Sequence, residues 1–61
     1  MRLEFFLIPI GKKYIKISLI AHEKGEYFEA FGVFNGKREY RRAKEKQEAI
    51  NSVYECLKSI E

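Results

Sequence analysis

The chain of 61 residues is long enough for one domain, which we place at residues 1–61, and its net charge at pH 7 is +3. Charged residues make up 34% of the chain and hydrophobic residues 46%, a balance that excludes a disordered protein. Cys56 is the lone cysteine, which excludes a disulfide within the monomer and favours a reducing, cytoplasmic location. Because a domain this small buries only about 60% of its unfolded surface, we expect a homodimer to add stability.

Several kinds of functional site are also excluded by composition. His22 and Cys56 are the only soft metal ligands, whereas a structural zinc usually needs four. The chain contains no Asp, no Gly-x-Ser-x-Gly elbow and no glycine-rich phosphate loop. Its longest apolar run, residues 5–10, is far shorter than the roughly 20 residues that cross a bilayer. We therefore expect no enzyme activity, no metal, no cofactor and no membrane partner.

The first element, residues 2–9, is predicted to be a strand. Its apolar side chains occupy both faces, with Leu3, Phe5 and Leu7 on one and Phe6 and Ile8 on the other. A run that is apolar on both faces is typical of a strand covered on both sides. Pro9 and Gly11 then mark a turn.

Two further strands are predicted at residues 14–21 and 26–34, because apolar and polar side chains alternate in the first and aromatic residues dominate the second. His22 to Gly25 form the turn between them. Gly32, in the middle of a strand, indicates either a bulge or the close approach of another element. If that element is the helix, the side of residues 26–34 that carries Ala30 and Gly32 faces it.

Asn35-Gly36 is the clearest local signal, because this pair favours a type I′ hairpin turn in which both residues have positive φ. The turn predicts a charged edge strand over residues 37–42. From residue 43 to residue 60 the period becomes helical. The apolar stripe of this helix is formed by Ala49, Ile50, Val53, Leu57 and Ile60. The predicted fold class is α+β: a four-stranded antiparallel meander, β-β-β-β-α, with one C-terminal helix packed on one face.

The second face of this sheet carries the candidate site. If Ile15, Ile17 and Leu19 face the helix, aromatic and basic side chains alternate on the opposite face. The first three strands contribute Phe6, Tyr14, Lys16, Tyr27 and Phe31. The last strand adds either Tyr40 with Arg38 and Arg42, or Lys37 with Arg41, depending on its register. Single-stranded nucleic acid binds such faces through stacking on aromatic rings and contacts between cations and phosphates.

Half of the twelve basic residues lie between Lys37 and Lys46, which is the charge pattern of a phosphate-binding surface. Solvated surface clusters of this length are also common. The candidate nucleic-acid-binding residues are Tyr14, Lys16, Tyr27, Phe31, Arg38, Arg41, Arg42 and Lys44. An uncovered apolar sheet face is more often a protein interface, so the alternative is a protein-protein interaction module, an inhibitor or accessory subunit, that uses the same face.

Two short segments carry a resemblance to a known family: Tyr14-Ile15-Lys16-Ile17 and Lys24-Gly25-Glu26-Tyr27-Phe28. Together with the order of the elements, they resemble the PUR repeat of purine-rich-element-binding proteins and the similar Whirly fold. That resemblance implies a curved sheet that binds single-stranded DNA or RNA, built from two such units packed together. One unit is present here, so the resemblance implies a homodimer. The basic density between residues 37 and 46 exceeds what the resemblance requires. The second half also resembles a double-stranded-RNA-binding domain, whose first helix has no counterpart here.

Overall fold

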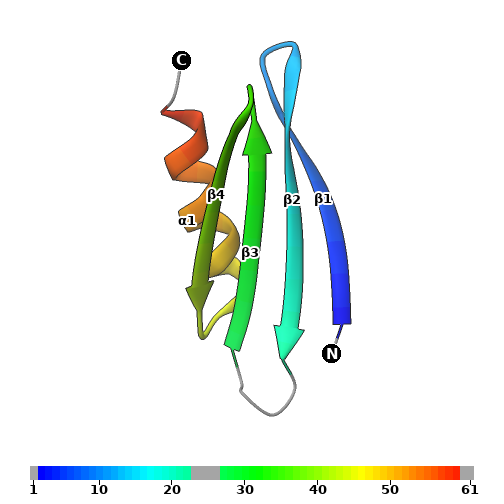
Figure 1. The fold of residues 1–61 in the computed structure, drawn as a ribbon, viewed down its shortest axis with the longest axis vertical. Coiled ribbons are helices and arrows are strands. Elements are labelled where there is room, and N and C mark those ends of the chain that lie inside the picture. Colours follow the sequence, from blue (N-terminus) through cyan, green and yellow to red (C-terminus); the bar gives the residue numbers. More distant parts are fainter. Residues whose placement is uncertain (1, 23–26, 60–61) are drawn as a thin grey trace.

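The computed structural model describes residues 2–22 and 27–59 of the chain. Its elements are β1 (Arg2–Ile10), β2 (Lys13–His22), β3 (Tyr27–Phe34), β4 (Lys37–Ala43) and α1 (Lys46–Lys58). The strands form one antiparallel sheet in the order β1-β2-β3-β4, and the helix packs on one side of it (Figure 1). The predicted fold class is confirmed.

The Asn35-Gly36 turn closes the β3–β4 hairpin as predicted. Both residues have positive φ, 52° at Asn35 and 79° at Gly36, which the type I′ geometry requires. The hairpin places Phe34 opposite Lys37 and therefore Phe31 opposite Tyr40. Of the two registers left open by the sequence, the structure adopts the one that puts Arg38, Tyr40 and Arg42 on the face opposite the helix.

Element boundaries differ from the predictions by one to three residues. The strand β4 continues to Ala43, and the helix begins at Lys46 rather than at residue 43. Ala43 is half-buried opposite Phe28 and packs against the core, which favours keeping it in the sheet. His22 was predicted in a turn, but it is the last residue of β2 and pairs with Tyr27. The predictions for residues 23–26 and for Ile60 lie outside the described residues.

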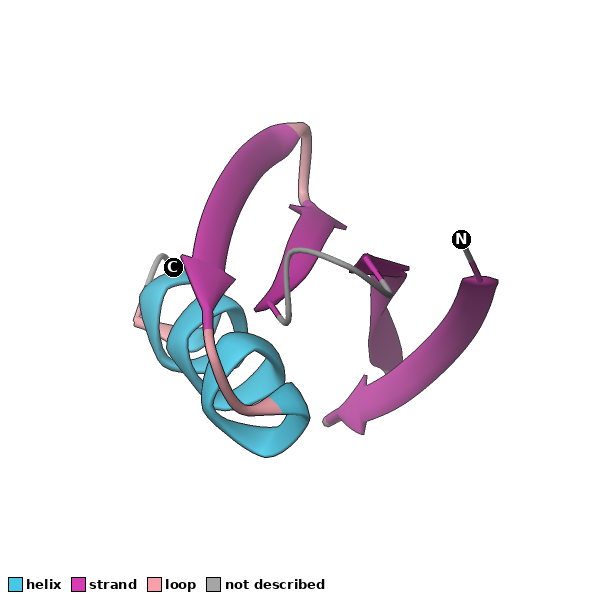
Figure 2. Cartoon of the chain, turned by 90° about the horizontal axis from the view of Figure 1, so that it is seen from below, coloured by secondary structure: helices cyan, strands magenta, loops and turns pink. Residues whose placement is uncertain are grey.

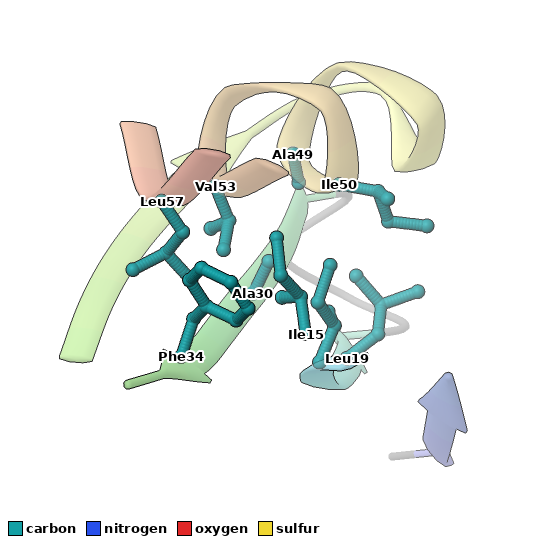
Figure 3. Packing of buried hydrophobic residues seen from close by; sticks show 9 residues of the cluster. Ile15, Leu19, Ala30, Phe34, Ala49, Ile50, Val53 and Leu57 are labelled. Carbon is teal, nitrogen blue, oxygen red and sulfur yellow. The ribbon is translucent and has the colours of Figure 1, made fainter. Parts of the chain in front are cut away.

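The helix lies over the β3 and β4 half of the sheet (Figure 2). We call the side of the sheet that it covers the helix face and the opposite side the open face. Ile15, Ile17 and Leu19 point to the helix face and are almost completely buried. They pack with Ala30 and Phe34 of β3 (Figure 3). The helix contributes the four buried residues Ala49, Ile50, Val53 and Leu57. The apolar stripe read from the sequence is therefore the buried side of α1.

Gly32 is needed because the helix crosses β3 at this point. A Cβ atom at residue 32 would overlap Val53 Cγ1 and lie 2.7 Å from Leu57 Cδ1. The ladders on both sides of Gly32 run without interruption, so no bulge is present. Of the two explanations predicted for this glycine, close approach of the helix is correct.

The first strand differs most from its prediction. It was expected to be covered on both faces, but Leu3, Phe5 and Leu7 are exposed on the open face. The strand β1 is also an edge strand, whose outer side pairs with no other described strand. Phe6 was expected on the open face, yet it lies opposite Ile17 and packs against the core. Phe5 takes its place on the open face and is 71% exposed. Because β1 is apolar on both sides, alternation within the strand could not decide which side faces the helix.

Candidate nucleic-acid interface

The open face is built by alternate residues of all four strands, since directly opposed residues in an antiparallel sheet share a face. Arg38, Tyr40 and Arg42 of β4 lie opposite Val33, Phe31 and Glu29 of β3. The β2 residues next to them are Lys16, Ser18 and Ile20. The contributors from β1 are Leu3, Phe5 and Leu7, with Tyr14 of β2 opposite Pro9. The sheet thus brings six predicted site residues onto one face: Tyr14, Lys16, Tyr27, Phe31, Arg38 and Arg42.

Two aromatic rings form a surface pair near the middle of β3 and β4. The centroids of the Phe31 and Tyr40 rings lie 4.8 Å apart with 44° between their planes. Both residues are 42% exposed, so part of each ring remains available to a ligand. Exposed rings of this kind are suitable platforms for the stacking of a nucleobase.

A second aromatic cluster lies toward the C-terminal end of β2. The Tyr27 ring stacks on His22, with centroids 4.5 Å apart and 16° between the planes. The guanidinium carbon of Arg42 lies 5.0 Å from the centroid of the same Tyr27 ring. A cation at this distance is attracted by the electron-rich face of the ring, so Tyr27 helps to hold Arg42 over the open face.

Glu29 is the carboxylate between these two clusters. Its Oε1 lies 3.0 Å from His22 Nε2, and its Oε2 accepts a hydrogen bond of 2.8 Å from the Tyr40 hydroxyl. These bonds, chiefly the one with His22, lower the pKa of Glu29 below its usual value. The bond to Glu29 also raises the pKa of Tyr40. Glu29 therefore fixes the position of the Tyr40 hydroxyl and so restricts where the ring lies on the open face.

The positive charge of the open face comes from Lys16, Arg38 and Arg42. Within residues 2–22 and 27–59, none of these three side chains forms an ion pair. Among the described residues, Glu29 is the one carboxylate beside them on this part of the open face, so positive charge is in excess there. Lys16 and Arg38 flank Val33 from the two neighbouring strands. Lys44 is exposed in the segment between β4 and α1. These cations are placed to attract an anionic ligand to the half of the face where the aromatic pairs lie.

Arg41 is separated from the other predicted site residues. It lies opposite Ala30 on the helix face, where its guanidinium donates to Glu39 Oε1 at 2.9 Å and to Cys56 Sγ at 2.7 Å. Lys58, which is close to Cys56 in the sequence, pairs instead with Glu55 within the helix. Arg41 thus connects β4 to α1 through its hydrogen bond to Cys56, on the face of the sheet opposite to Arg38 and Arg42.

The apolar strip of β1 could not be identified from the sequence. Leu3, Phe5 and Leu7 are 56%, 71% and 62% exposed on the open face. The sequence shows that these three residues share one face of the strand. Which face of the sheet that is follows only from the pairing of β1 with β2. The open face therefore has two parts: an aromatic and basic half over β3 and β4, and the apolar strip at the free edge of β1.

The surface of α1 carries acidic side chains as well as its two lysines. Glu45, Glu48 and Glu55 are exposed on and just before α1, away from its buried stripe. The nearby Lys46 is engaged with Glu4 of β1, at 2.9 Å between Nζ and Oε1. The helix surface therefore lacks the excess of cations found on the open face, which favours the sheet as the surface that attracts a polyanion.

Within the part of the chain that the structure describes, no three His, Cys, Asp or Glu side chains gather as a metal site. No helix among those residues is long and apolar enough to cross a membrane. Comparisons with protein-family models, with curated protein sequences and with solved structures found no match. The resemblance to PUR repeats and Whirly domains therefore stays a prediction, and the case for function depends on the geometry of the open face.

Proposed function

We propose that the open face binds single-stranded nucleic acid. The observation that carries this proposal is the exposed pair of Phe31 and Tyr40, flanked by Arg38 and Arg42, neither of which forms an ion pair among the described residues. Stacking on an exposed ring requires an unpaired base with an accessible face. A duplex hides its base faces within the helix, so the single-stranded form is favoured.

The binding mode follows from the spacing of the rings and the cations. One base stacks on the exposed surface of Phe31 and Tyr40, and its phosphates lie toward Arg38 and Lys16. Tyr27 carries Arg42 on its ring, and that arginine meets the next phosphate. Because aromatic stacking tolerates every base, we expect a weak preference for sequence.

Fluorescence anisotropy of labelled single- and double-stranded oligonucleotides at low salt, followed by a salt titration, tests this function. We expect the single strand to bind more tightly and its affinity to fall as salt rises, because bound phosphates release counterions. No binding to either form at tens of micromolar protein, even at low salt, would contradict the proposal.

Two arginine variants provide a matched pair for the same assay. The double variant Arg38→Ala/Arg42→Ala should weaken binding and reduce the salt slope by about 1.4, since each phosphate contact on a single strand contributes about 0.7. Arg41→Ala removes a neighbouring arginine of the same strand that lies on the helix face, so it should leave the slope unchanged. Equal slopes for the double variant and wild type would remove these arginines from the interface.

A protein-protein interaction module is the second candidate, favoured by the exposed apolar strip Leu3, Phe5 and Leu7. A module of this kind would cover the aromatic half with a partner protein and would not respond to oligonucleotides. Acrylamide quenching of tyrosine fluorescence separates the two cases. If the open face binds nucleic acid, an added oligonucleotide should protect its tyrosines from quenching. If the chain is an interaction module, the oligonucleotide should leave the quenching unchanged.

A further inference from the structure

The free edge of β1 is the second surface that the fold leaves unpaired. Its outer side has no neighbouring strand among the described residues, and it runs for nine residues, Arg2–Ile10. Leu3, Phe5 and Leu7 stand exposed along it. Long apolar edges with free backbone donors and acceptors readily pair with another strand. We propose that β1 pairs antiparallel with β1 of a second copy of this chain, joining two sheets into one of eight strands.

The two edges of the sheet differ in charge, and this difference selects β1. The opposite edge, β4, carries Lys37, Arg38, Arg41 and Arg42, against the single acid Glu39. Pairing two copies through β4 would set these cations against one another, and like charges directly opposite are destabilising. On β1 the only charges are Arg2 and Glu4, which lie near one end and bridge each other at 3.8 Å.

Stacking the open faces of two copies is disfavoured for the same reason. Lys16, Arg38 and Arg42 would be buried against the same groups of the second copy. Removing an unpaired charge from water is strongly unfavourable. Pairing at the edge brings the two apolar strips together and leaves these three cations in water.

The residues of β1 also select a register. A two-fold axis perpendicular to the sheet, placed between the two β1 strands, keeps both helices on the same side. Because directly opposed side chains share a face, one β1 residue must lie at the axis and face its own counterpart in the second copy. With the axis at Glu4, two glutamates would be directly opposed. With the axis at Phe6, Leu3 would pair with Pro9, which has no N–H to give to the ladder.

An axis at Phe5 avoids both faults. Leu3 then lies opposite Leu7 of the second copy and Phe5 lies opposite its own counterpart, so apolar side chains meet apolar side chains on the open face. On the helix face Glu4 meets Phe6, and the ladder runs from Arg2 to Ile8 without reaching Pro9. Cross-strand aromatic and aliphatic pairs of this kind stabilise a sheet.

The assembled sheet carries two aromatic and basic halves on one side, with the apolar strips joined between them. A single strand long enough to cross the strip would contact both halves, which raises avidity without new contacts. This consequence depends on the proposed function, whereas the dimer itself does not. Oligomeric state is therefore measured without nucleic acid: a monomer that binds oligonucleotides overturns only the dimer, and a dimer that ignores them overturns only the proposed function.

Sedimentation equilibrium from low to high micromolar concentration is the first test. We expect twice the mass of the chain at the upper end for wild type and a monomer for Phe5→Glu, which would place two carboxylates on the axis. Val33→Glu is the matched control: Val33 is also exposed on the open face, but it lies on β3, and its mass should follow wild type. A wild-type chain that stays monomeric, or a Phe5→Glu chain that stays dimeric, overturns the proposal.

Cysteine cross-linking tests the register independently of any folding defect in Phe5→Glu. In a Cys56→Ser background, oxidised Phe5→Cys should form a covalent dimer, because residue 5 faces its own counterpart. Leu3→Cys and Leu7→Cys should each cross-link poorly alone and well when mixed, because they face each other. Equal cross-linking by all three single variants, or none by Phe5→Cys, would overturn the assigned pairing.

Discussion

Gly32 of β3 and Val53 of α1 approach so closely that a Cβ atom on residue 32 would overlap Val53 Cγ1. This contact sets the distance between the helix and the sheet. The same crossing buries Val53 and Leu57 completely. The position of the helix over β3 and β4 depends on this glycine.

Gly32→Ala should therefore lower the free energy of unfolding by about 1–3 kcal/mol, the usual cost of overpacking a core. Replacing a strand glycine by alanine otherwise stabilises by about 0.4–1 kcal/mol through the unfolded chain, so the overlap decides the sign. Adding Val53→Ala should recover part of the loss. Urea denaturation of the two single variants and the double variant measures the coupling, and strictly additive effects would contradict the contact.

The carboxylates Glu29 and Glu4 predict a loss of stability in acid. Hydrogen bonds from His22 and Tyr40 lower the pKa of Glu29 below 4.5, and the bond from Lys46 does the same for Glu4. The folded chain then binds protons more weakly than the unfolded chain. This stability is fully present above pH 4.5 and is lost as the pH falls through the lowered folded pKa.

Urea denaturation from neutral pH to about pH 3 measures this loss. Glu29→Gln should flatten the acid dependence, and Tyr40→Phe should flatten it less, since His22 still bonds to Glu29. Superimposable profiles for Glu29→Gln and wild type would show that the Glu29 bonds are not maintained in solution. The raised pKa of Tyr40 works in the opposite sense, so its contribution is lost as the pH rises through that value, above the ordinary 10.0.

The ion pair between Lys46 and Glu4 joins α1 to β1 and should stabilise β1 against local opening. Lys46 Nζ bonds to Glu4 Oε1 and lies 5.7 Å from the centroid of the Phe6 ring. Lys46→Gln should therefore speed amide hydrogen exchange in β1 more than in β3. Lys58→Gln is the control, because Lys58 pairs within the helix and should leave β1 unchanged. Uniform acceleration across the sheet in Lys46→Gln would mean a global loss of stability instead.

Much of the fold could be predicted because each local signal agrees with the tertiary packing. Asn35-Gly36 specified its hairpin, and the alternation around Ile15, Ile17 and Leu19 identified the buried face. The helix start was placed too early, because Ala43 suits a helix and a buried strand end equally well. Tertiary contact with Phe28 decided in favour of the strand.

The candidate site was harder to predict, because it depends on register. Arg41 and Arg42 are adjacent, so alternation along the strand puts them on opposite faces. Only the β3–β4 pairing shows that Arg41 faces the helix and Arg42 the open face. Phe5 and Phe6 present the same problem at β1. No pattern within an element that is apolar or basic on both faces states which side is buried, so these assignments required the sheet itself.

The aromatic pair predicts that stacking and charge contribute separately to binding. Phe31→Leu keeps an apolar side chain but removes the ring face, and should weaken single-strand binding by about 5- to 150-fold, corresponding to 1–3 kcal/mol per stacked base. Its salt slope should match wild type, because no phosphate contact is lost. Tyr54→Leu is the control, since Tyr54 lies on the helix beside Lys58, and its affinity should not change. Anisotropy titrations at two salt concentrations measure both quantities. An unchanged affinity for Phe31→Leu would remove the aromatic pair from the interface and leave binding, if present, to the cations alone.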